Sequence, residues 1–197
     1  MIKYNYIKYS GAILFLVALL FLPVNKLASN NLPDFISNAP IESMQGGDNE
    51  NTLKSVYLYN FTRYIDWKTT ADNKFVILVI GDSAIVPALN IIAKSRAVDG
   101  MQIVVKSERN NIDINNCNMI YVPASQNDKL RTILFQMDNN TNALVVSEVH
   151  GDAVQGADIN FVVDDNMLRF EINNFSLKKH GLKASSQLLK LAVNVFE

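Results

Sequence analysis

Apolar side chains recur every three or four residues from Leu53 to Ile65, which is the period of an amphipathic helix. Asn51 or Thr52 can cap this helix, and Trp67 closes it. One face of it is strongly aromatic, with Tyr57, Phe61, Tyr64 and Trp67. At helical spacing this face is typical of core packing, and a recognition surface is the alternative.

A continuous apolar run follows from Phe75 to Ile80, and its length and β-branched residues predict a strand buried on both faces. Apolar runs over 101–105, 119–122 and 143–147 predict three further strands. Amphipathic stretches over 84–95 and 126–136 predict helices between them. Strands and helices that alternate at short spacing indicate an α/β fold with a mostly parallel sheet.

The pattern changes near the end of the chain. Two apolar runs, at 159–163 and 167–172, flank Asp164-Asp165-Asn166, which predicts a β-hairpin. A last amphipathic helix is expected over 185–195. The expected fold is therefore α/β, with a mostly parallel central sheet flanked by helices on both faces, ending in an antiparallel hairpin and a C-terminal helix.

The N-terminal segment reads as an export signal. Lys3 and Lys8 precede an apolar run from Gly11 to Leu22, which is shorter than the roughly 20 residues of a spanning helix. An uncleaved anchor is the alternative. We expect a signal peptide over 1–28, a flexible leader rich in Asn, Pro, Gly and Ser over 29–51, and a single domain over 52–197.

Composition narrows the function classes. The 197 residues include 18 Lys and Arg and 19 Asp and Glu, and cleavage near Ser29 would leave 15 basic and 19 acidic residues. This balance argues against nucleic acid as a partner. A single cysteine, Cys117, excludes an internal disulfide and a multi-cysteine zinc site, and export favours a buried thiol.

Candidate chemistry is sparse. The turn Gly81-Asp82-Ser83 lacks the further glycines of a dinucleotide loop, so it reads as a plain turn. Glu148, His150 and Asp152 alternate and would share one face if extended, but no clear fourth metal ligand accompanies them. We expect no enzyme activity, cofactor or metal. An unrecognised hydrolase is the remaining enzymatic alternative.

Six stretches carry a family resemblance: KSVYLYNFTRYIDW at 54–67, FVILVIGD at 75–82, CNMIYV at 117–122, GADINFV at 156–162, RFEIN at 169–173 and GLKASSQLLKLA at 181–192. In this order they resemble the YfiR-like family of exported bacterial proteins, over nearly all of residues 51–195. Two departures stand out: Cys117 has no second cysteine with which to pair, and Ala157 occupies the second position of a family Gly pair.

The resemblance implies a periplasmic, non-enzymatic regulator in cyclic di-GMP signalling. Such a protein binds the periplasmic part of an inner-membrane diguanylate cyclase and represses it. A sensor kinase, an OmpA-like outer-membrane lipoprotein and a second copy of the chain are further candidate partners. The alternative is an extracytoplasmic sensor that binds a small molecule near Gly81 and Pro123, at the carboxyl ends of the parallel strands.

The resemblance also implies partner contacts at Phe161, Glu171, Asn173 and Leu177. An aromatic residue beside an acid on an exposed strand face would suit a binding hot spot. The alternatives are that Phe161 belongs to the core, that Glu171 is an ordinary outward-facing strand residue and that Asn173 caps a helix.

Overall fold

A computed structural model describes residues 48–67, 73–110, 112–137, 142–164 and 166–197. The described helices are α2 (Asp48–Tyr64), α3 (Ile85–Ser95), the 3-10 helix η1 (Ala124–Lys129), α4 (Leu130–Gln136), α5 (Asp152–Gln155), α6 (Asn174–Lys179) and α7 (Ser186–Leu191). The described strands are β1 (Ile65–Asp66), β2 (Lys74–Ile80), β3 (Ala97–Val98), β4 (Met101–Glu108), β5 (Met119–Val122), β6 (Leu144–Ser147), β7 (Ile159–Asp164), β8 (Met167–Asn173), β9 (Lys183–Ala184) and β10 (Asn194–Phe196).

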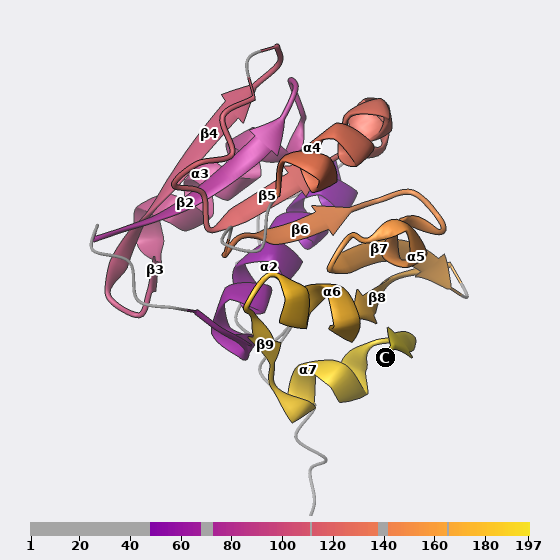
Figure 1. Cartoon of the computed structure of the whole chain (residues 1–197). Helices are drawn as coiled ribbons and strands as arrows, with labels where there is room; N and C mark the ends of the chain where they lie inside the picture. Colours follow the sequence, from indigo (N-terminus) through magenta and orange to yellow (C-terminus); the bar gives the residue numbers. More distant parts are fainter. Residues whose placement is uncertain (1–47, 68–72, 111, 138–141, 165) are drawn as a thin grey trace, which may run out of the picture. The chain divides into compact units, whose positions relative to one another are not determined.

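An eight-stranded sheet runs in the order β10-β8-β7-β6-β5-β2-β4-β3 (Figure 1). Strands β4, β2, β5, β6 and β7 run parallel to one another, as the buried apolar runs predict. The hairpin β7–β8 and the short strand β3 pair antiparallel, and β10 pairs parallel with β8. The expected fold class is confirmed, including the closing hairpin.

Helices cover both faces of this sheet (Figure 1). On one face α2 carries the aromatic residues, and its Phe61 is fully buried between the rings of Phe161 and Phe170, 5.8 and 5.2 Å away. On the other face Leu130 and Ile133 of α4 pack on side chains of β2, β5 and β6. The interpretation of the aromatic helix face as core packing is therefore confirmed for Tyr57 and Phe61, which are 8% and 0% exposed.

Two helices differ from the expected boundaries. Helix α2 begins at Asp48, three residues before the expected cap at Asn51. The last helix ends at Leu191, although a helix over 185–195 was expected. Residues 193–196 alternate Val, Asn, Val and Phe, a strand-like pattern of β-branched and aromatic residues, and β10 pairs with β8 there.

The expected signal peptide and most of the expected leader lie outside the described residues. Within the described ranges, no helix is both long and apolar enough to span a membrane.

Candidate functional site

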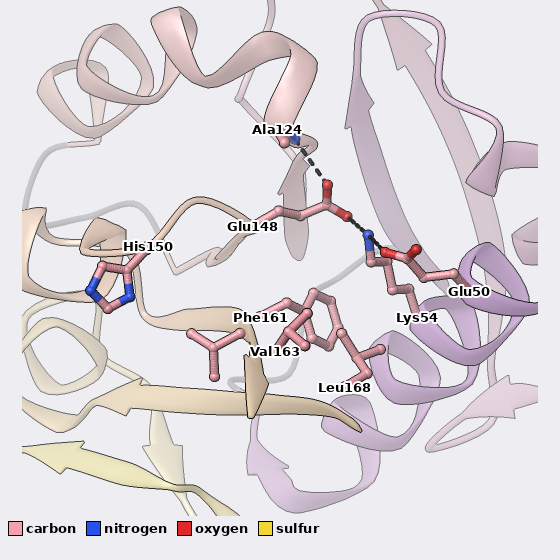
Figure 2. Close-up of a pocket in the computed structure, with 9 residues that line it drawn as sticks. Glu50, Lys54, Ala124, Glu148, His150, Phe161, Val163 and Leu168 are labelled. Carbon is pink, nitrogen blue, oxygen red and sulfur yellow. Dashed lines mark hydrogen bonds and ion pairs between the residues drawn. The ribbon is translucent and has the colours of Figure 1, made fainter. Parts of the chain in front are cut away.

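A cavity of about 310 Å³ opens at the carboxyl ends of β5 and β6, beside the first turns of α2 (Figure 2). Charged residues form one side and apolar residues of the hairpin β7–β8 form the other. It is lined by Glu50, Lys54, Ala124, Glu148, His150, Phe161, Val162, Val163 and Leu168. Pro123 directly follows β5 and Glu148 directly follows β6. The loops after these two parallel strands therefore leave the sheet at the same edge.

Glu148 organises the charged side of the cavity. One carboxylate oxygen accepts the backbone N–H of Ala124 at 2.9 Å. The other lies 2.7 Å from Nζ of Lys54 and also accepts the hydroxyl of Tyr121. Lys54 is in turn 2.6 Å from Glu50, one helical turn earlier (Figure 2). Two carboxylates thus surround one ammonium group, so this side of the cavity carries a net negative charge.

Burial and these contacts shift two pKa values. Burial, together with the neighbouring Glu148 carboxylate, raises the pKa of Tyr121 far above its ordinary value, so its hydroxyl stays protonated and donates. Burial lowers the pKa of Lys54, but hydrogen bonds and attraction from Glu148 and Glu50 more than reverse this, and the net shift is upward. Lys54 is therefore a permanent cation at neutral pH.

The apolar side of the cavity belongs to the aromatic core. Phe161 is only 2% exposed, and its ring lies 5.8 Å from the ring of Tyr57 in an edge-on arrangement. Val163, nearer the tip of the hairpin, is 74% exposed. The cavity therefore combines a charged wall with an apolar wall, which suits an amphipathic group rather than a purely polar one.

The residues expected to contact a partner lie on opposite faces of the sheet. Phe161 pairs with Phe170 across the hairpin and packs toward α2. Glu171 pairs with Asn160, and alternation along the strand puts both on the other face. The arrangement of an aromatic residue beside an acid on one exposed face is therefore not present, and both side chains are buried, at 2% and 6% exposed.

Glu171 belongs to a row of polar side chains that crosses four strands. The hydroxyl of Ser147 donates to Asn160 at 3.0 Å, and Asn194 donates its amide to Glu171 at 2.7 Å. The register places Asn160 opposite both Ser147 and Glu171, and Asn194 opposite Glu171. Glu171 is thus a hydrogen-bonded, buried residue and not an outward-facing one.

Asn173 and Leu177 hold α6 in place. The Asn173 side chain accepts the N–H of Ser176 at 2.8 Å, so it is the N-cap of α6, which confirms that alternative. Its amide also donates to the carbonyl of Ala153 at 2.7 Å, which ties α6 to α5. Leu177 is fully buried. In this conformation all four candidate residues are at most 8% exposed, and their role toward a partner stays a prediction.

The other sequence motifs form no reactive site. Gly81 has a φ of 72°, and a Cβ there would lie 2.7 Å from the Gln126 side chain, so the turn is closely packed rather than open to a phosphate. Asp152 is fully buried and accepts the N–H of Val149, whereas His150 is exposed. In the described part of the chain, no three His, Cys, Asp or Glu side chains gather as a metal would require.

Sequence reasoning missed Lys54, Glu50 and Tyr121 as parts of a site. The i, i+4 spacing of Glu50 and Lys54 is a readable signal for an ion pair on a helix. The meeting of α2 with the loop after β6 is a tertiary contact that no spacing reveals. The expectation of a pocket near Pro123 was close in position, because Ala124 lines the cavity; Gly81 does not line it.

Comparison with known proteins places this fold in a family. A comparison with curated proteins gives no match. A model of the family described as YfiR/HmsC-like (DUF4154) matches residues 51–193, which includes most of α2, every strand from β1 to β9 and α7. This span is well over half of the 197 residues. The chain therefore belongs to the YfiR/HmsC-like family.

Proposed function

We propose that this protein is an exported, non-enzymatic regulator that binds the periplasmic part of an inner-membrane diguanylate cyclase and represses it. The observation that carries the proposal is the family match over residues 51–193, because this family is consistent with periplasmic regulation of such cyclases. The apolar run from Gly11 to Leu22 supports export. A sensor kinase, an OmpA-like lipoprotein and a second copy of the chain are further proposed partners.

The described surface supports protein binding more readily than catalysis. Several large apolar side chains are exposed, among them Phe135 at 89%, Val154 at 69% and Phe175 at 67%. Exposed aromatic residues are the type enriched at protein interfaces. At the cavity, Lys54 is paired with both Glu50 and Glu148, which suits a structural or recognition role.

The test is the cellular level of cyclic di-GMP in the native host. Deleting the gene releases the cyclase, so cyclic di-GMP should rise several-fold, and the full chain should restore the original level. The matched control is the chain without residues 1–28, which stays in the cytoplasm and should not restore it. An unchanged level after deletion would remove the proposed repression.

A direct test uses crosslinking to the full chain in intact cells. The expected product contains an inner-membrane protein with a diguanylate cyclase domain. A cyclase variant that lacks its periplasmic part should lose the crosslink. A crosslink that survives this truncation would contradict the proposed binding region.

The cavity at Lys54 and Glu148 favours a second candidate function, a small-molecule sensor. Its position at the carboxyl ends of parallel strands is where α/β sheets commonly bind ligands. A thermal-shift screen with small amphipathic amines tests it, since the cavity combines net negative charge with an apolar wall. Stabilisation should disappear in Glu50→Gln, whereas Glu108→Gln should retain it. Equal shifts in both variants would exclude this cavity.

A further inference from the structure

Strand β10 is a short edge strand that covers less than half of its neighbour. It has three residues, and these pair with Glu171, Ile172 and Asn173, whereas β8 has seven. Among the described strands, none pairs with residues 167–170 of β8 on the side away from β7. Beyond the ladder, one backbone bond extends the contact, from Val193 N–H to the Phe170 carbonyl at 3.0 Å.

Few interactions hold β10 in place. The Asn194 amide donates to Glu171 at 2.7 Å, and Asn174 donates to the Glu197 carboxylate at 3.0 Å. Glu197 also lies 3.5 Å from Lys178, but both side chains are about two-thirds exposed, so this ion pair adds little. No residue from Val193 to Glu197 is buried. An element with so little buried apolar surface opens more easily than the rest of the sheet.

Strand β10 covers the residues expected to meet a partner. Glu171 is bonded to Asn194, and Asn173 lies opposite Phe196 in the register. The family match ends at Val193, one residue before β10 begins. The matched part of the chain therefore includes the β8 edge but not β10.

We propose that the outer edge of β8 is the docking site for an extended segment of the protein partner, which takes the place of β10. This inference rests on the proposed function, because the partner is the periplasmic part of the regulated membrane protein. Addition of a strand to a sheet edge is a common way to bind an extended peptide, since the backbone supplies the hydrogen bonds. Removing β10 frees the Glu171 carboxylate from Asn194 and exposes the backbone edge of residues 171–173, while the Asn173 side chain stays bonded to α5 and α6.

The edge defines the chemistry of the segment. The partner segment should repeat the residue types of Asn194 to Glu197, which are polar, aliphatic, aromatic and acidic in that order. An amide in the segment would then bond Glu171, and a carboxylate would bond Asn174 and Lys178. Val154 and Phe175 are exposed residues of α5 and α6, the two helices that Asn173 joins at this end of β8. They offer apolar contact to the aromatic position.

A segment of another protein fits this edge better than a second copy of the chain. A partner segment of six or more residues can also pair with residues 167–169, which lie beyond the reach of β10 and Val193. The Leu168 carbonyl there accepts the Tyr57 hydroxyl at 3.3 Å, but a carbonyl has a second lone pair. A second copy would offer the same three residues directly after α7, and so would gain no pairing.

The test measures peptide binding to the full chain by fluorescence anisotropy. The probe is a labelled peptide, Thr-Val-Thr-Val-Asn-Val-Phe-Glu, in which a β-branched extension precedes the sequence of residues 193–197. Asn194→Asp sets a carboxylate beside Glu171 and weakens β10 but leaves the β8 edge intact. Because apparent affinity rises with the fraction of open edge, we expect binding about tenfold tighter or more than to the wild type.

Controls separate the edge from general effects. Asn90→Asp makes the same chemical change on the exposed side of α3 and should bind like the wild type. The short peptide Val-Asn-Val-Phe-Glu should bind more weakly, and a probe with proline in place of the Val at position 195 should not bind. Equal affinity of Asn194→Asp and Asn90→Asp would overturn the proposal.

Hydrogen exchange on the wild type provides a measurement without any variant. Amides of 193–196 should exchange at least a hundredfold faster than those of β5, and equal protection would overturn the proposal. A mass that doubles with concentration through exchange of β10 would overturn the choice of another protein as occupant. These assays use the purified chain, so a negative result would not contradict the proposed repression of a cyclase. A negative result in the cyclic di-GMP test would likewise not contradict peptide binding at the β8 edge.

Discussion

The carboxylate of Asp158 holds the imidazole of His180 inside the domain, with Nδ1 at 2.8 and 3.0 Å from its two oxygens. The two side chains are 0% and 3% exposed. Asp158 also accepts the N–H of Val145 at 2.7 Å, and its carbonyl accepts the N–H of Asn173. One residue thus connects β6, β8 and the end of α6.

Replacing His180 with alanine should cost about 3 kcal/mol of unfolding free energy, because it leaves a buried carboxylate without its partner. Urea denaturation measured by circular dichroism gives this value. His150→Ala is the matched control, since His150 is the other histidine of the chain and is exposed. It should stay within about 0.5 kcal/mol of the wild type.

A small effect of the His180→Ala substitution would contradict this prediction. A loss below about 1 kcal/mol for His180→Ala would mean that the pair barely outweighs the desolvation of its two groups. In that case the position of α6 would depend on Leu177 and the Asn173 cap instead.

The central sheet could be predicted from the sequence because its strands are continuous apolar runs, such as 75–80 in β2. The hairpin was equally readable, because a turn-rich tripeptide separates two such runs. The short helices α5 and α6 were not predicted. They have four and six residues, too few for a helical period to show, and tertiary contacts such as the Ser176 hydroxyl to the Gly156 carbonyl hold them.

The prediction that Glu171 faces outward was wrong for a physical reason. Asn160, Glu171 and Asn173 alternate with apolar residues, and this pattern usually means that the polar residues face water. Here all three are buried: Asn160 accepts from the Ser147 hydroxyl, Glu171 accepts from the Asn194 amide, and Asn173 donates to the Ala153 carbonyl. Burial of this kind depends on distant segments, and no local pattern reports it.

Phe161→Ala tests whether this residue acts through the core. It is 2% exposed and packs against the rings of Tyr57 and Phe61, so the substitution should cost about 3–4 kcal/mol of unfolding free energy. Phe175→Ala is the matched control, because Phe175 is 67% exposed and should cost under about 0.5 kcal/mol. If both variants kept wild-type stability, Phe161 would not be the core residue that its contacts indicate.

Lys54→Met tests the charged side of the cavity. Glu148 would lose its cation but keep the Ala124 N–H and the Tyr121 hydroxyl, so we expect a smaller loss than at His180, about 2 kcal/mol. Chemical denaturation at neutral pH measures it. Lys94→Met, an exposed lysine of α3, serves as the control and should change stability little. Equal values for the two lysines would show that Glu148 needs no cation.

Cys117 should be an inert thiol in the folded protein. It is 8% exposed, and burial raises its pKa to about 11. The thiolate is the reactive form, so at pH 8 only about one molecule in a thousand is reactive, against roughly a quarter of a cysteine with an ordinary pKa near 8.5.

Alkylation by iodoacetamide at pH 8, followed by mass spectrometry, should therefore be at least about a hundredfold slower in the native protein than in urea. Because the thiolate fraction grows tenfold per pH unit below the pKa, the native rate should keep rising up to pH about 11, whereas the unfolded rate should level off near pH 9. An Ala124→Cys variant gives an exposed thiol in the same chain and should react at the unfolded rate. A native Cys117 rate equal to that of this added cysteine would mean that the thiol is reachable, and a redox role through pairing with another molecule would then become the better interpretation of the lone cysteine.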